Sequence, residues 1–104
     1  IGMVGMDIET AVRNRIGIVT IVFNNGVMAI ERGSMPYAAE EFDSLVLGGD
    51  YARVADALGA WGRRVERVED FLPSFRQAVE VAESGQPALL DCIVKEGYDF
   101  SKYP

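Results

Sequence analysis

The strongest constraint on the fold is a run of apolar and β-branched residues that ends in two amides and a glycine. Residues 18–23 read IVTIVF, and Asn24, Asn25 and Gly26 follow directly. A continuous run of this kind is typical of a strand that is buried on both faces of a parallel sheet. In open sheets of parallel strands, ligands bind at the carboxyl ends of the strands. The run therefore predicts a central strand with a candidate ligand site after it, although an ordinary Asn-Gly turn is the simpler alternative.

Helical and extended patterns alternate along the rest of the chain. The spacing of the apolar residues predicts three helices and two further strands, at residues 7–14, 50–58 and 69–84 and at residues 61–68 and 88–94, respectively. Residues 33–49 show little periodicity and predict a long loop with at most a turn of helix. The alternation implies right-handed crossovers between parallel strands. We therefore predict an α/β fold with three layers, in which a doubly wound, mostly parallel sheet has helices on both faces.

Composition and charge exclude several classes of protein. The net charge of −6 argues against nucleic-acid binding. The absence of histidine excludes a histidine-based catalytic triad and a histidine-containing zinc site. The single cysteine, Cys92, cannot form a disulfide within the chain and favours a reducing, cytoplasmic location. No apolar stretch reaches the roughly 18 residues that a membrane span needs, so we expect neither nucleic acid nor a membrane as a partner.

Several segments of the chain together carry a resemblance to one enzyme family. Residues 6–13 read MDIETAVR, residues 21–26 read IVFNNG, residues 50–60 read DYARVADALGA and residues 86–91 read QPALLD. In this order and spacing they resemble the C-terminal, diphosphate-binding domain of thiamine diphosphate enzymes of the acetolactate synthase and 2-oxo acid decarboxylase group. The family pairs Asn-Asn with an upstream Gly-Asp-Gly, which is absent here and by family spacing would fall just before Ile1. The resemblance thus implies a single, partial domain over residues 1–104.

The resemblance implies roles for five residues around the two amides. The side-chain oxygen of Asn25 and the backbone carbonyl of Val27 would coordinate Mg²⁺, which prefers oxygen ligands and bridges them to phosphate oxygens. Asn24 and Gly26 would shape the turn. Met28 would line the cofactor pocket, although an apolar residue at this position is equally consistent with a core residue.

Glu31 is the candidate catalytic residue. It lies six residues beyond Asn25, at a position where the pyruvate decarboxylase branch of the family carries an active-site glutamate. A carboxylate there could transfer protons to and from the reacting intermediate. The alternative is a surface charge that pairs with Arg32 or Arg13.

The implied function is a part of a thiamine diphosphate- and Mg²⁺-dependent enzyme, a lyase or transferase that acts on 2-keto acids by decarboxylation or by acetolactate synthase-like carboligation. The cofactor supplies the carbanion chemistry. A pyrimidine-binding domain of the same or a neighbouring chain would activate the cofactor, so the chain should be inactive alone. Two alternatives stay open: the small subunit of a split thiamine diphosphate enzyme, and a non-catalytic α/β binding or assembly module.

A homo-oligomer is the expected assembly. We expect five apolar residues to lie around the missing part of the metal motif, namely Met3, Met6, Val27, Met28 and Ile30. Exposed apolar patches usually mark interfaces, so we expect this side of the domain to mediate self-association.

Overall fold

The structure is a computed structural model that describes residues 4–96. The chain separates into two compact units, each of which is considered by itself. The first unit comprises Ile1–Asn24 and Asp50–Ile93, and the second comprises Asn25–Gly49 and Val94–Pro104.

A three-stranded parallel sheet forms the middle of the first unit. Its strands are β1 (Val19–Asn24), β2 (Trp61–Val65) and β3 (Ala88–Ile93), in the order β1-β3-β2. β3 pairs in parallel with both neighbours, and Val19 and Trp61 both lie opposite Ala88. The three strands consequently start in register and their carboxyl ends lie at the same edge of the sheet.

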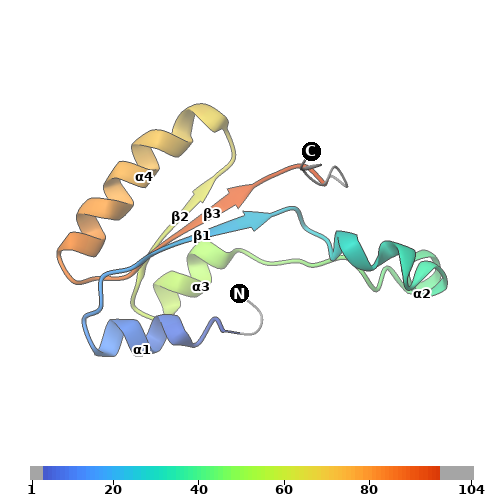
Figure 1. Ribbon diagram of the computed structural model, residues 1–104, viewed down its shortest axis with the longest axis horizontal. Coiled ribbons are helices and arrows are strands. Elements are labelled where there is room, and N and C mark those ends of the chain that lie inside the picture. The colour runs from blue at the N-terminus through green and yellow to red at the C-terminus, as the bar shows by residue number, and fades with distance from the viewer. Residues whose placement is uncertain (1–3, 97–104) are drawn as a thin grey trace, which may run out of the picture. The chain divides into compact units, whose positions relative to one another are not determined.

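Helices cover both faces of this sheet (Figure 1). The helix α4 (Val68–Glu83) lies on one face, and α1 (Asp7–Arg13) and α3 (Tyr51–Ala57) lie on the other. The side chains of β3 alternate between the two sides: Leu90 packs with residues of α4, whereas Leu89 packs with residues of α1 and α3. The predicted α/β architecture, with a parallel sheet between two layers of helices, is confirmed.

The prediction of a central position for β1 is wrong. Within the described residues, β1 is an outer strand and β3 is the central one. Phe23 of β1 is 73% exposed, whereas all residues of β3 except the last are buried. An apolar run reports on the two faces of a strand, but the central or outer position depends on hydrogen bonding at its two edges. The side-chain pattern therefore carried no information on this point.

The second unit contains more helix than the sequence predicted. A short 3₁₀ helix, η1 (Ala29–Gly33), precedes α2 (Pro36–Phe42), and Val27 and Val46 form an isolated antiparallel bridge. None of the residues of α2 is buried, so this helix has no apolar periodicity that a sequence pattern could reveal.

Candidate functional site

A buried carboxylate lies on the central strand near the carboxyl ends of the strands. Asp91 of β3 is 0% exposed and lies opposite Val22 of β1 and Arg64 of β2. Its Oδ1 accepts a hydrogen bond from Asn24 Nδ2 at 3.0 Å, and its Oδ2 accepts one from the backbone N–H of Tyr51 at 3.1 Å. Oδ2 also lies 3.6 Å from Nη1 of Arg64. Asp91 therefore joins β1, α3 and β2, and these partners compensate for the loss of hydration of a buried charge.

The strand geometry explains why Asn24 reaches this carboxylate. Successive side chains of a strand alternate between faces, so Asn24 lies on the same face as Val22, which is opposite Asp91. An ionised carboxylate can only accept hydrogen bonds, so Asn24 presents its NH₂ group to it. Asn24, predicted to shape the turn, is thus anchored to the central strand.

The charge of Asp91 affects two neighbouring groups. The pKa of Arg64 is raised, above all by its hydrogen bond to Glu66 and further by the negative charge of Asp91. The pKa of the Cys92 thiol is raised by burial and then by the charge of Asp91. Arg64 consequently stays a cation beside Asp91. Cys92 stays a neutral thiol, which is a poor nucleophile.

The turn that follows β1 brings together the two predicted metal ligands. The backbone N–H of Val27 donates a hydrogen bond to Oδ1 of Asn25 at 3.2 Å. Gly26 between them has φ 72°, a left-handed conformation that glycine adopts without strain. The hydrogen bonds of the bridge to Val46 come from the residues on either side of Val27, so both backbone polar groups of Val27 point away from Val46. The Val27 carbonyl is therefore not used in the bridge.

This turn fits part of a site for a hard divalent cation. Oδ1 of Asn25 keeps a second lone pair beyond the one that Val27 uses, and the Val27 carbonyl is a second neutral oxygen. Oxygen donors of this kind suit Mg²⁺. In the described part of the chain, no three residues of the types His, Cys, Asp or Glu form a cluster that could hold a metal ion. The remaining ligands would have to be phosphate, water or other residues.

Because β1 is an outer strand, Asn25 does not follow a central strand as the sequence predicted. Its role as a metal ligand stays a prediction, which the geometry of the turn supports. No helix within residues 4–96 is long and apolar enough to cross a bilayer.

The other predicted residues lie in the second unit. Met28 is 44% exposed, and Ile30 is 71% exposed, so neither is a core residue of this unit. Glu31 is half-buried in η1. The two arginines considered as its partners form ion pairs with Glu96 and Glu9, at 2.7 and 3.2 Å for Arg32 and Arg13, respectively. The catalytic role of Glu31 stays a prediction.

Two of the apolar residues expected at an interface belong to the N-terminal part of the chain. Met6 is 67% exposed, as a contact surface requires, and Met3 lies outside the described residues. Self-association also stays a prediction.

The sequence reasoning assigned no role to Asp91. The available signal was one acidic residue in the otherwise apolar run ALLDCIV, at residues 88–94. Charged residues are almost never fully buried without partners. The contact with Tyr51 uses its backbone N–H and therefore leaves no trace in the residue types.

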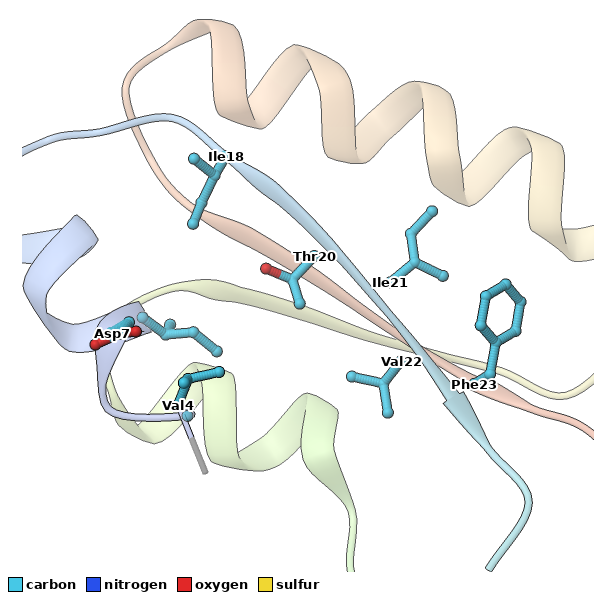
Figure 2. A pocket seen from close by; sticks show the side chains of 9 residues that line it. Val4, Asp7, Ile18, Thr20, Ile21, Val22 and Phe23 are labelled. Atoms are coloured by element: carbon cyan, nitrogen blue, oxygen red, sulfur yellow. The ribbon is translucent and has the colours of Figure 1, made fainter. Parts of the chain in front are cut away.

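An apolar hollow lies beside the outer strand (Figure 2). It has a volume of about 470 Å³ and is lined by β1 and by residues at the start of α1. Ile21 and Phe23 project to one side of the strand, and Thr20 and Val22 to the other. The lining of the hollow is mostly apolar.

Comparison with known proteins gives consistent matches. The family model of the thiamine pyrophosphate enzyme C-terminal TPP binding domain matches residues 1–92. The chain is 30% identical over 98 residues to YdaP of Bacillus subtilis, which is named as a thiamine pyrophosphate-containing protein, covering 88% of this chain and 16% of that protein. It is 30% identical over 94 residues to the acetolactate synthase large subunit IlvG of Mycobacterium tuberculosis, covering 88% of this chain and 17% of that protein. The chain thus spans about a sixth of the length of these relatives.

Proposed function

This chain belongs to the C-terminal TPP binding domain family of the thiamine pyrophosphate enzymes, and we propose that within its enzyme it anchors the cofactor diphosphate through Mg²⁺. The resemblance drawn from the sequence motifs is confirmed at the level of the family, and thiamine pyrophosphate is another name for thiamine diphosphate. The observation that carries the proposal is the turn in which Asn25 Oδ1 and the Val27 backbone come together at the end of β1.

The roles of the individual residues follow from their chemistry. Asn25 Oδ1 and the Val27 carbonyl would supply two neutral oxygens to the metal ion, and Gly26 provides the left-handed conformation between them. Asn24 would hold the start of the turn through its bond to Asp91. Met28 directly follows the turn in the sequence, and its side chain is exposed. It would contact the cofactor.

We also propose a reaction class for the complete enzyme. We place it among the lyases or transferases that act on 2-keto acids, because one relative is named as an acetolactate synthase. When bound, thiamine diphosphate would supply an electron sink for negative charge at the former keto carbon of the substrate. Glu31 would then move a proton at the intermediate. A pyrimidine-binding domain, from the same or a neighbouring chain, and self-association would complete the site.

Asn25 offers the direct test of metal anchoring. In the complete enzyme, Asn25→Ala should weaken Mg²⁺-dependent binding of thiamine diphosphate by at least about tenfold, because it removes a metal ligand. Asn25→Asp keeps an oxygen at the same place and adds a charge, so binding should be retained. Isothermal titration calorimetry measures both affinities.

A matched control is Asn14→Ala, since Asn14 is an exposed amide whose side chain donates to the Thr10 carbonyl at the end of α1. This variant should bind the cofactor as the wild type does. An Asn25→Ala enzyme with wild-type affinity for the cofactor would refute the proposed anchoring.

A further inference from the structure

We propose that Asp91 is a positioning residue that clamps together the two ends of the segment carrying the metal-binding turn, an inference that rests on the proposed function of that turn. The chain leaves the first unit after Asn24 and returns to it at Asp50, and Asn25–Gly49 lies between these points. Asp91 accepts hydrogen bonds from Asn24, the last residue before the segment, and from Tyr51, the second residue after it.

One carboxylate makes both contacts. Its Oδ1 receives the Asn24 amide at 3.0 Å, and its Oδ2 receives the Tyr51 N–H at 3.1 Å. These partners lie 67 and 40 residues away from Asp91 along the chain. Asp91 itself is fixed by the pairing of β3 with strands on both sides. Both ends of the segment are thereby tied to the most buried strand of the sheet.

Packing alone does not account for a carboxylate at this position. The residues that precede Asp91 on β3, Leu89 and Leu90, are apolar and fully buried. Apolar residues of similar volume often replace buried charged groups without loss of stability. What the carboxylate contributes here, and an apolar residue could not, is a directional attachment for a side-chain amide and a backbone N–H.

The consequence for the cofactor follows from the covalent connection. The proposed ligand Asn25 is the residue next to Asn24, so an error in the placement of Asn24 passes directly into the turn. Partners that orient metal ligands typically change metal affinity by about 10- to 100-fold when they are mutated. We expect an effect of this size when the clamp is broken.

Hydrogen–deuterium exchange on the complete protein without cofactor tests the clamp independently of binding. Asp91→Leu keeps about the size of the side chain but removes both acceptor oxygens, so the bonds from the Asn24 amide and from the Tyr51 N–H are lost together. Exchange should become faster at residues 25–27 and 51–53 and stay unchanged in α4.

The matched control is Asp56→Leu, because the Asp56 carboxylate also accepts a backbone N–H, from Gly62 at 2.8 Å, and ties α3 to the start of β2. The control should leave residues 25–27 unaffected. Unchanged exchange at residues 25–27 in Asp91→Leu, or an equal increase throughout the first unit, would overturn the clamp.

Cofactor affinity separates an indirect role from a direct one. Asp91→Leu, which removes both acceptor oxygens, should weaken Mg²⁺-dependent binding of thiamine diphosphate by roughly 10- to 100-fold in calorimetric titrations. Asn24→Asp should weaken it as well, because two carboxylates would then face each other. The double variant Asn24→Asp with Asp91→Asn exchanges the donor and the acceptor and should recover most of the affinity.

The result that overturns the clamp is equally specific. If Asn24 bound the metal itself, Asn24→Asp would keep or raise the affinity for Mg²⁺, and the double variant would show no recovery. If Asp91→Leu fails to fold, Asn24→Ala removes one arm of the clamp and leaves Asp91 with Tyr51 and Arg64. That variant should then show the weaker binding and the faster exchange at residues 25–27, and wild-type behaviour would overturn the inference.

Asn25→Ala distinguishes failure of the clamp from failure of the proposed function. Wild-type affinity in Asn25→Ala would refute metal anchoring by the turn, and the exchange experiment would still decide whether Asp91 holds the segment. Weak binding in Asn25→Ala with wild-type binding in Asp91→Leu would refute the clamp alone.

Discussion

Gly62 of β2 is a position where the addition of one methyl group should damage the fold. A Cβ atom added there would lie 2.0 Å from the backbone oxygen of Ala52 and 2.7 Å from its carbonyl carbon. Cβ atoms in proteins essentially never approach other atoms to less than 3.0 Å. The atoms in the way belong to the backbone of α3, so no side-chain rotation can remove the clash. Gly62→Ala must therefore move α3 away from β2 by about 1 Å, the difference between 3.0 and 2.0 Å.

The expected loss of stability follows from what α3 contributes to the core. Ala52 and Ala55 of this helix are 5% and 0% exposed, so a shift opens the packing on this face of the sheet. Overpacking of a tight site costs about 1–3 kcal/mol, and the upper end applies because backbone has to move. Replacing glycine by alanine returns about 0.5–1 kcal/mol of conformational entropy. The free energy of unfolding should thus fall by about 2 kcal/mol, the difference between these contributions.

Urea unfolding followed by circular dichroism measures this loss. With a slope of about 1 kcal/mol per M, the midpoint should fall by about 2 M. Gly33→Ala is the control, because an added Cβ meets nothing within 4 Å and Gly33 has no positive φ. That variant should be neutral or more stable by up to about 1 kcal/mol. A Gly62→Ala midpoint equal to that of the wild type would refute the close approach of α3 to β2.

Two further predictions concern titratable side chains. Glu31→Gln in the complete enzyme should lower turnover of a 2-keto acid by about 10²–10⁴-fold without changing cofactor affinity, and a steady-state rate within about twofold of the wild type would refute the catalytic role. The pKa of Cys92 is raised from its usual 9.0 by burial and then by Asp91, so the folded protein holds this proton more tightly than the unfolded chain. This contribution to stability is complete below pH 9.0 and is lost as the pH rises through the folded pKa. In Cys92→Ala, the urea midpoint should therefore fall less steeply with rising alkaline pH than in the wild type. An equally steep fall in the two proteins would contradict this contribution of Cys92.

Local signals in the sequence placed the helices and strands of the first unit well. The helix predicted over residues 50–58 begins at Asp50, whose Oδ1 accepts a hydrogen bond from the Arg53 N–H at 3.0 Å at the start of α3. The predicted range stops just before Gly59, which has φ 90°. Such caps involve residues close in the chain, so a residue type at the right spacing is sufficient to predict them.

The features that the sequence did not predict are non-local or lack a buried face. The outer position of β1 depends on the hydrogen bonding of its edges, which its side chains do not encode. The helix α2 buries no residue, so its sequence shows no helical spacing of apolar residues from which it could be predicted. In the candidate site, the hydrogen bond from the Val27 N–H to Asn25 Oδ1 joins residues two positions apart. The turn preferences of asparagine and glycine could have predicted such a local bond. The contacts of Asp91 join three elements that only the folded chain brings together.

The two faces of β3 explain how one short strand can serve both the core and the site. Towards α4, its residues Ala88, Leu90 and Cys92 are all buried and apolar in character, so this face only packs. Towards α1 and α3, Leu89 packs in the core, and Asp91, two residues nearer the carboxyl end, is polar. The change from leucine to aspartate on the same face occurs where Asn24 ends β1 and Tyr51 begins α3. A buried charge is unfavourable without partners, so Asp91 is compatible with a stable first unit only while Asn24 and Tyr51 stay bonded to it. These two hydrogen bonds would then also hold the ends of the segment that carries Asn25 and Val27.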